Sequence, residues 1–386
     1  DDGVSEDRAR QHDLRGGWHD AGDYNKYQNA PYVYGLARAY AWRRTAFDAL
    51  VPVAPGQQGY LDELRWGGQH VLRMLAPDGS AYGGITTGYR YWGPPDKETD
   101  NVPNTGDERT IRGAELGNDS SEHAAALARL AVLDPANADW REGAARALAW
   151  CTAHGNTGPR VCSAALDLYT ATHEEQFAAR AKFTLPAPSG DHAVVELVER
   201  YDAVFQEDHR AALRNALTAR ADEYLVVSMN PFGIATFGSP DAPNFFGTPA
   251  AGTDINAWHV GNSSRVLEAA TAAALAWRYT GDAKYRAYAV RQLDWILGVN
   301  PYALCLMEAR GTNNAPTYHH RYIRCGVARG AVPGGIPNGI TFRGPGIDAP
   351  YFDLSGNERP RYEPNEVWLP HNTNYLNALA ALYDRR

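Results

Sequence analysis

The sequence is short of positive charge and of long hydrophobic runs. Its 386 residues include 37 Lys and Arg against 45 Asp and Glu, so the formal net charge is −8. No basic block is present, which makes nucleic acid and anionic membranes poor partners. No apolar run approaches the ~20 residues that a membrane-spanning helix needs. We therefore expect neither nucleic-acid nor membrane partners.

Cysteine is also scarce. The four cysteines, Cys151, Cys162, Cys305 and Cys325, form no CxxC pair and no Cys/His cluster with zinc spacing, so no metal ligands are predicted. A Gly- and Pro-containing turn lies between the first two, and a disulfide there would suit an exported protein. Four buried free thiols are the equal alternative.

Apolar and aromatic side chains are plentiful. Hydrophobic residues make up 44% of the chain, enough for a sizeable core, and there are 10 Trp and 22 Tyr. Aromatic faces suit sugar rings, although large folds also bury Trp for packing alone. The length suits one large domain or two ordinary ones. We predict a single catalytic domain over 1–386, with no separate binding module.

The chain repeats one pattern, an Ala-, Leu- and Arg-rich helix followed by a loop rich in Gly, Pro, Asn and aromatic residues. Strand signals are few, at 83–87 and 225–228, and no alternating βαβ pattern appears. These features predict an all-α toroid of paired helices whose long loops, 76–118 and 299–365, build a site. The predicted helices span 31–50, 61–75, 121–133, 140–153, 192–205, 210–224, 265–279, 283–297 and 372–383.

The first candidate for chemistry is GGWHDAGDYNKY, residues 16–27. Asp20 and Asp23 stand three apart across Gly22, which permits a tight bend that aims both carboxylates at one point. Two close carboxylates can hold one water, one removing its proton while the other orients it. An Asx-rich turn that only caps the next helix is the structural alternative.

A second candidate is RYEPNEVWLPHNTNYLNALAAL, residues 361–382. Glu363 and Glu366 stand just before a predicted helix. A carboxyl packed against Tyr362 and Trp368 loses hydration, which favours the protonated form that a general acid needs. Alternatively both glutamates only decorate the helix entrance, and we expect this for Glu363.

Three further segments could bind a ligand. In TYHHRYIR, residues 317–324, His319 and Arg321 could point the same way from an extended segment and donate hydrogen bonds to sugar hydroxyls. The adjacent histidines would point apart, which disfavours a metal site. Tyr91 and Trp92 in GYRYWGPP resemble a sugar platform, and NAWHVGNSSRV supplies Trp258. Ordinary packing is the alternative in each case.

Taken in order, these segments resemble glycoside hydrolase family 9, which includes many cellulases. GGWHDAGDYNKY resembles the G-G-W-x-D-A-G-D block of that family, its most specific feature. LDELRWGGQHVLRMLAPDG, GNDSSEHAAALARLAVL and YTGDAKYRAYAVRQLDWILGVNP resemble three of its helical segments. HHR and PNEV…HN are similar to its two C-terminal active-site segments. The resemblance covers nearly the whole chain.

The resemblance implies an (α/α)6 barrel and hydrolysis of β-1,4-glucosidic bonds with inversion. It places the general base on Asp23, the water-holding carboxylate on Asp20 and the general acid on Glu366. Catalysis then requires no cofactor, and structural calcium stays open. We expect an oligo- or polysaccharide substrate, a monomer, and an extracellular or periplasmic location. The expected substrate-binding residues are His319, Arg321, Trp92, Tyr91, Trp258, Tyr362, Asn365 and Trp18.

The sequence departs from the family pattern in several places. The stretch before His319 contains unusual residues, among them Glu308, and the acidic position before Glu366 holds Asn357, with Asp353 four residues earlier. The segment 330–346 is atypical, and Trp368 replaces a small residue. The D-A-G-D block also comes early, so we expect the first barrel helix to be missing, held elsewhere or supplied by an upstream region.

These departures leave several functions open. The leading hypothesis is an inverting endoglucanase. An exo-acting β-glucosidase or exo-β-glucosaminidase is the alternative, and an acid placed to bind an amino group, such as Glu308 or Asp353, would favour the glucosaminidase. A carbohydrate-binding protein without activity is disfavoured by the intact acid and base. A polysaccharide lyase is disfavoured because it must neutralise a uronate, whereas this chain is acidic overall.

Overall fold

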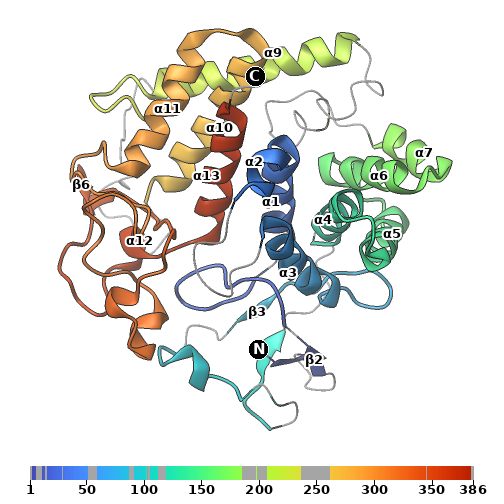
Figure 1. The fold of residues 1–386 in the computed structure, drawn as a ribbon, viewed down its shortest axis with the longest axis horizontal. Coiled ribbons are helices and arrows are strands. Elements are labelled where there is room, and N and C mark those ends of the chain that lie inside the picture. The colour runs from blue at the N-terminus through green and yellow to red at the C-terminus, as the bar shows by residue number, and fades with distance from the viewer. Residues whose placement is uncertain are drawn as a thin grey trace. The chain divides into compact units, whose positions relative to one another are not determined.

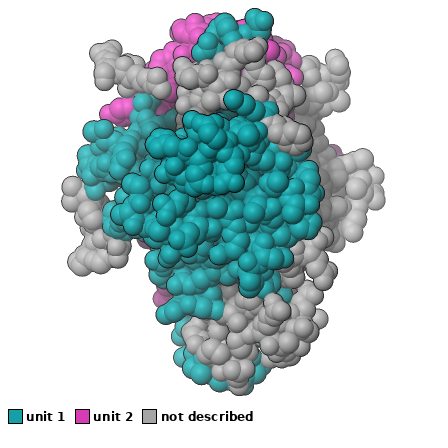
Figure 2. Space-filling view, turned by 90° about the vertical axis from the view of Figure 1, so that its right-hand side faces the viewer, with its two compact units in different colours: residues 1–20, 25–91, 96–210 teal, residues 21–24, 92–95, 211–386 magenta. Residues whose placement is uncertain are grey.

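The chain forms two compact units, which are coloured separately in Figure 2. Unit 1 comprises 1–20, 25–91 and 96–210, and unit 2 comprises 21–24, 92–95 and 211–386. The computed structural model describes residues 2–5, 11–13, 15–27, 29–50, 59–86, 91–100, 102, 105–111, 119–184, 197, 207–235, 261–344 and 346–383. The helix predicted at 192–205 falls almost wholly outside this range.

Unit 1 is a group of helices around α4, Asp119–Leu133, which packs against α1, α3, α5 and α6 (Figure 1). Consecutive residues of α4, from Ala124 to Ala128, have no exposed surface. A helix that is apolar on every side must be covered on every side, which explains its central place. The other helices are α1 Ala30–Trp42, α2 Arg44–Asp48, α3 Tyr60–Arg73, α5 Ala138–Ala153, α6 Pro159–Thr172 and α7 Glu175–Phe183.

Local sequence explains several helix boundaries. The side chain of Asn137 accepts a hydrogen bond from the N–H of Asp139 at 3.1 Å and so caps α5, while Pro159 begins α6. The predicted helix 31–50 is divided at Arg43, where the backbone is not helical. The predictions did not include α6 and α7, although α6 contains the largely apolar stretch VCSAALDLY.

Unit 1 also carries a small sheet in the order β2-β1-β4-β3. Its strands are β1 Asp2–Ser5, β2 Gln11–Asp13, β3 Ile85–Thr86 and β4 Arg109–Ile111. The pair β1–β4 is parallel and the other two pairs are antiparallel. The strand predicted at 83–87 is thus confirmed by β3, whereas the one predicted at 225–228 is wrong, because α9 occupies those residues up to Val227.

Unit 2 is organised around α10, Ser263–Thr280, which packs against α11, Ala283–Leu297, and α13, Leu369–Leu382 (Figure 1). Its core includes Ile336, Ile340 and Phe342, so the atypical segment 330–346 lies within the packed unit. The remaining elements are α9 Glu207–Val227, α12 Tyr362–Asn365, the antiparallel strands β5 Thr341–Gly344 and β6 Ile347–Tyr351, and the 3₁₀ turns Pro95–Lys97, Arg321–Cys325 and Ala328–Gly330.

All four cysteines are free thiols. The alternative of a disulfide between Cys151 and Cys162 is therefore wrong, and Cys162 instead contacts the carbonyl of Ala181 at 3.7 Å. Cys325 is exposed, so three of the thiols are buried instead of four. None of the described helices combines the length and apolar character that a membrane crossing requires.

A buried ion pair joins two helices of unit 1. Arg129 of α4 contacts Asp167 of α6 at 3.1 Å, and both side chains are 1% exposed. Arg129 also lies over the ring of Tyr34 on α1, with 5.0 Å between the guanidinium carbon and the ring centre. The pair therefore links three helices through charge and aromatic contact.

We expect Arg129→Met to lower the free energy of unfolding by about 3–5 kcal/mol, because it leaves the Asp167 carboxylate buried without its cation. Asp167→Leu added to Arg129→Met should recover most of that loss, since the double variant buries no charge. Urea unfolding of the wild type, both single variants and the double variant checks this. Additive losses would contradict the prediction.

Candidate active site in unit 2

Unit 2 brings four separate segments together by backbone hydrogen bonds: 21–24, 319–321, 336–338 and 365–368. The segment that carries Glu366 is central. It pairs with 319 on one side, in parallel orientation, and with 337 on the other, in antiparallel orientation. A further bridge joins Ala21 to Trp368. Residues far apart in the sequence are thereby held within one small layer.

Gly22 is required at the place where the 21–24 segment meets the 319–321 segment. A Cβ atom on Gly22 would lie 1.9 Å from the carbonyl oxygen of His319, which no real side chain tolerates. The carbonyl of Gly22 also accepts a hydrogen bond from the N–H of Arg321 at 3.0 Å. The glycine of the D-A-G-D block thus serves close backbone approach more than a special φ angle.

Arg321 holds the backbone around Asp23. Its side chain is fully buried, and its guanidinium donates to the carbonyl of Asp23 at 3.2 Å and to the carbonyl of Gly93 at 3.1 Å. It also lies over the ring of Tyr24 at 5.3 Å. The geometry supports a positioning role for Arg321, and its predicted contact with a sugar stays a prediction.

His319 is neutral in this environment. Its Nδ1 lies 2.7 Å from the carbonyl oxygen of Pro360, which can only accept, so Nδ1 carries the proton. Burial lowers the pKa of His319 from 6.5 to about 4. Nε2 of the neutral ring is then an acceptor, and the predicted contact of His319 with a sugar hydroxyl stays a prediction.

Trp92 lies between two other side chains. Its ring centre is 4.4 Å from that of His319, and the guanidinium of Arg359 stands over the indole at 4.5 Å. A sugar that stacked on the face covered by Arg359 would have to displace that arginine. The open platform that the sequence suggested is therefore partly occupied, and a sugar contact of Trp92 stays a prediction.

Glu366 is buried, with 6% of its surface exposed, and lies beside the two aromatic residues that the sequence predicted. The pKa of Tyr362 is raised, chiefly by burial and then by the charges of Glu363 and Glu366. The contact with Trp368 differs from the expected apolar wall, since its indole N–H donates to Oε2 of Glu366 at 3.0 Å. Glu363 pairs with Arg361 at 2.8 Å, as expected for a residue at a helix entrance.

Asn365 has no exposed surface and uses its amide inside the protein. Its Nδ2 donates to the carbonyls of Thr317 and Asp353, both at 2.9 Å, and its Oδ1 accepts from the N–H of Asp353 at 3.2 Å. Asn365 thereby ties the segment before His319 to the segment before Glu366. The geometry supports a positioning role, and direct substrate binding by Asn365 stays a prediction.

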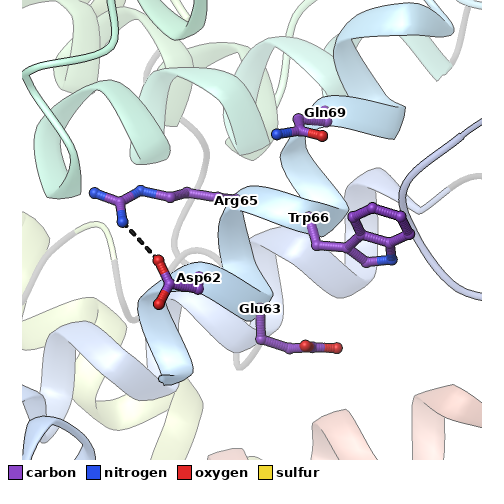
Figure 3. Close-up of a pocket in the computed structure, with 5 residues that line it drawn as sticks. All are labelled: Asp62, Glu63, Arg65, Trp66 and Gln69. Atoms are coloured by element: carbon purple, nitrogen blue, oxygen red, sulfur yellow. Dashed lines mark hydrogen bonds and ion pairs between the residues drawn. The ribbon is translucent and has the colours of Figure 1, made fainter. Parts of the chain in front are cut away.

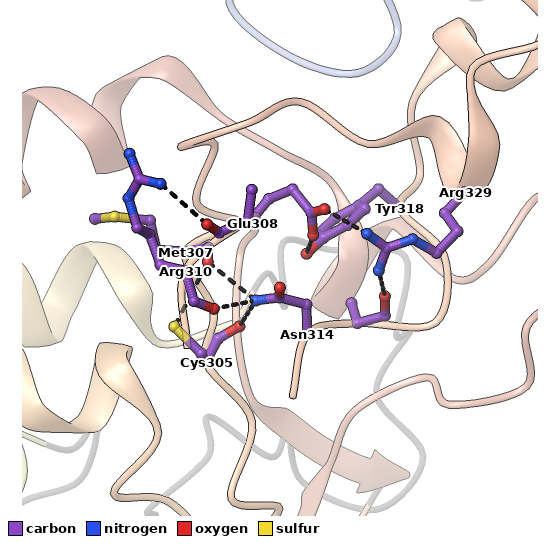
Figure 4. A network of polar contacts seen from close by, with 9 residues as sticks. Cys305, Met307, Glu308, Arg310, Asn314, Tyr318 and Arg329 are labelled. Carbon is purple, nitrogen blue, oxygen red and sulfur yellow. Dashed lines mark hydrogen bonds and ion pairs between the residues drawn. The ribbon is translucent and has the colours of Figure 1, made fainter. Parts of the chain in front are cut away.

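Glu308 and Asp353, the two acids considered for binding an amino group of a substrate, form hydrogen bonds with other groups of the protein. Glu308 is 3% exposed and accepts hydrogen bonds from Tyr318 and Arg329 (Figure 4). Asp353 accepts from the N–H of Arg361 at 2.8 Å and from that of Ser355 at 2.9 Å. Although burial opposes it, these hydrogen bonds lower the pKa of Asp353.

Four predicted site residues are not among the described residues of unit 2. Asp20, Trp18 and Tyr91 belong to unit 1, and Trp258 lies outside the described residues. The N–H of Asp20 donates to the carbonyl of Asn25 at 3.0 Å, which closes the base of the D-A-G-D turn. The indole N–H of Trp18 donates to Glu63 of α3 at 2.6 Å.

The outer face of α3 borders a surface pocket of about 340 Å³ (Figure 3). Trp66 is 47% exposed there, and Arg65 pairs with Asp62 at 2.7 Å and with Asp134 at 2.8 Å. Arg65 is thus shared between two carboxylates, and Glu63 accepts a hydrogen bond from the indole of Trp18. The pocket lies within unit 1 and contains none of the predicted catalytic residues.

Asn338 and His371 near Glu366, and Arg359 over the ring of Trp92, were not predicted as site residues. Asn338 and His371 are fully buried polar residues, and a His-Asn pair after the P-N-E-V motif was the one signal in the sequence. Within the described part of the chain, no three His, Cys, Asp or Glu side chains are grouped as a metal ion would require. Structural calcium stays a prediction.

The free energy of unfolding should fall as the pH drops below about 6.5, because burial lowers the pKa of His371 to about 3 and that of His319 to about 4. Both histidines bind protons in the unfolded chain before they do in the folded chain. The stabilising contribution of both neutral histidines is fully present above pH 6.5. At pH 5 each histidine lowers the free energy of unfolding by up to about 2 kcal/mol. Urea unfolding at pH 7 and pH 5 should show a smaller loss for His371→Gln than for the wild type. Equal losses would contradict this.

Comparisons with known proteins agree on one family. Residues 1–379 match glycosyl hydrolase family 9. The chain is 23% identical to endoglucanase B of Cellulomonas fimi over 428 residues, which is 100% of this chain and 39% of that protein. The chain thus spans well under half the length of that relative.

Solved structures of the family share the fold. A thermostable endoglucanase of Alicyclobacillus acidocaldarius superimposes with a TM-score of 0.72 at 20% identity, covering 99% of this chain and 77% of that chain. A cellulase of C. cellulolyticum in complex with cellobiose has a TM-score of 0.67 at 19% identity, covering 96% of this chain and 88% of that chain. The predicted all-α, (α/α)6-barrel fold is confirmed, and the chain belongs to glycosyl hydrolase family 9.

Proposed function

We propose that this chain hydrolyses β-1,4-glucosidic bonds in cellulose or a related β-glucan, with inversion at the anomeric carbon. The observation that carries the proposal is the hydrogen-bonded layer of unit 2, in which the segments of Asp23, His319 and Glu366 adjoin one another. Family membership supports it, because the D-A-G-D and N-E-V segments of the chain supply a base and an acid. The proposal covers a single catalytic domain over 1–386.

In the proposed reaction, Asp23 removes a proton from a water molecule that Asp20 helps to hold. The water oxygen bonds to the anomeric carbon while the bond from that carbon to the glycosidic oxygen breaks. Glu366 gives its proton to the departing oxygen, so Asp23 ends protonated and Glu366 ionised until both exchange with solvent. An inverting enzyme needs ~6.5–9.5 Å between the two carboxyl groups to leave room for the water.

The proposed substrate rests on the relatives. Endoglucanase B and the cellobiose complex concern other proteins, but both suggest a β-glucan ligand for a chain of this family. A polymeric substrate would place the protein outside the cell or in the periplasm. We further propose that the chain acts as a monomer and that its own carboxyl groups suffice for the chemistry.

The structure weakens one alternative, the exo-β-glucosaminidase. Glu308 is neutralised by Arg329, and Asp353 is occupied by two backbone N–H groups, so neither is placed to bind an ammonium group. An exo-acting β-glucosidase uses the same acid and base. Product analysis separates it from an endoglucanase.

The decisive experiment is a time course of cellohexaose cleavage, with products separated by chromatography and the fresh anomer read by NMR. Internal cuts that yield α-anomers would support the inverting endoglucanase. Release of single sugars from one end would support the exo reading and retain Asp23 and Glu366 in their roles. Fresh β-anomers would overturn inversion, and absence of cleavage, repeated with chitosan oligomers, would favour a binding protein.

Glu366→Gln should lower kcat on cellohexaose by about 10²–10⁴-fold, since the amide has no proton to give to the leaving oxygen. Binding of cellohexaose, measured by calorimetry, should change little. Glu363→Gln is the matched control. Glu363 lies three residues before Glu366, pairs with Arg361, and should tolerate the change. Similar losses in the two variants would refute the assignment of the acid.

Asp23→Asn should abolish turnover of every substrate, including those with good leaving groups, because activation of water is needed in each case. Asp20→Asn should lower kcat less, since Asp20 only helps to hold the water. Initial rates on cellohexaose and on dinitrophenyl cellobioside check both variants. If Asp20→Asn is the more damaging change, the two roles should be exchanged.

A further inference from the structure

We propose that Trp368 is a positioning residue for the general acid, and that its indole N–H fixes one carboxyl oxygen of Glu366 and thereby aims the other. The inference rests on the proposed function of Glu366. It concerns a residue at which this chain departs from the family pattern, where a small residue is usual. Its basis is a chain of contacts that runs from α10 to the carboxyl group.

The first link is the contact between the two side chains. The indole nitrogen of Trp368 lies 3.0 Å from Oε2 of Glu366, a normal hydrogen-bond length. Glu366 is 6% exposed, so water competes little for that oxygen. A directed donor on a buried carboxyl restricts rotation of the carboxyl plane, and so helps to determine where the second oxygen lies.

The second link holds the indole itself. The ring of Trp368 stacks on the imidazole of His371, with 5.8 Å between ring centres and 14° between planes. His371 belongs to the first turns of α13 and is fully buried. Tryptophan has few rotatable bonds, so a fixed stacking partner is enough to keep its N–H pointed at Glu366.

The third link is the protonation state of His371. Its Nε2 lies 3.0 Å from Oδ1 of Asn338, which can only accept, so Nε2 carries the proton. Burial lowers the pKa of His371 to about 3, so the ring is neutral and Nδ1 accepts. The hydroxyl of Ser264 on α10, 3.0 Å from Nδ1, is then the donor.

Asn338 closes the arrangement. Its backbone N–H donates to the carbonyl of Glu366 at 2.8 Å, and its Nδ2 donates to the carbonyl of Tyr362 at 3.0 Å. One residue thus holds the main chain of Glu366 and orients the histidine beneath Trp368. The carboxyl group is fixed from its backbone side and from its tip at the same time.

The consequence for catalysis is a balance between two effects. Burial disfavours the ionised form of a carboxyl group, whereas donation from a neutral N–H favours it. By donating to Glu366, Trp368 offsets part of the preference for the protonated form that burial creates, so that the proton of Glu366 is available for transfer. It also directs that proton along one path. Without the donor, the carboxyl would keep its proton to higher pH and would be less well aimed.

Two histidines close to Glu366 do not titrate near neutral pH. His319 and His371 have pKa values lowered to about 4 and 3, and burial raises the pKa of Tyr362. Glu363 is paired with Arg361. The alkaline limb of the rate profile should therefore report on Glu366.

The test is Trp368→Phe, which keeps an aromatic ring and removes the donor. The alkaline limb of kcat/KM against pH on cellohexaose should move up by about one pH unit. At pH 6, kcat on cellohexaose should fall about tenfold, whereas kcat on dinitrophenyl cellobioside, whose leaving group needs no proton, should stay within about twofold. Trp140→Phe is the matched control, since it removes an indole-to-carboxylate bond of 3.1 Å to Asp134 in unit 1 and should leave the profile in place.

Ser264→Ala provides an independent test if Trp368→Phe does not fold, as judged by circular dichroism. It removes the hydroxyl donor at the far end of the chain of contacts and should move the alkaline limb the same way by a smaller amount. An unmoved limb, or equal losses on both substrates, would overturn the inference while leaving the proposed function intact. A wild type that cleaves neither substrate would overturn the proposed function and, with it, this inference.

Discussion

The contact between Gly22 and His319 is the constraint on which the candidate site depends. The backbone of the D-A-G-D turn approaches the 319–321 segment so closely that a Cβ atom would lie 1.9 Å from a carbonyl oxygen. Arg321 then reaches over this contact and donates to the carbonyls of Asp23 and Gly93. Since the 319 segment also pairs with the segment of Glu366, one close approach connects both proposed catalytic carboxylates to the same layer.

Most polar side chains of this layer form hydrogen bonds with the backbone of the protein. Asn365, Asn338 and Arg321 are fully buried and direct their donors mainly to backbone carbonyls. Unpaired polar groups are costly inside a protein, so such residues are retained where they order loops that have no regular secondary structure. Described parts of the 299–365 stretch are held in this way, which positions the segments of His319 and Glu366.

Residues that depart from the family pattern also hold the segments of the candidate site in place. Glu308 is buried and contacts both the exposed Arg329 and Tyr318, the residue directly before His319 (Figure 4). These contacts brace the loop that carries the histidine. Trp368 fills the space beside Glu366 that a small residue would leave and contributes a donor there. In the sequence these residues were departures that left the function open, whereas in the structure they contact the segments of His319 and Glu366.

The sequence alone was enough to predict the helical fold class, the family and most helices, because apolar periodicity and short motifs such as D-A-G-D are local properties. It was also enough to predict that Glu366 lies beside Tyr362 and Trp368, since they are near neighbours along the chain. Only the tertiary structure decided that Arg321 and Asn365 bind backbone, that His319 is a neutral acceptor, and that Trp368 donates to Glu366. Each of these depends on which distant carbonyl or carboxylate comes within 3 Å or so of a donor, and local pattern carries no information on that distance.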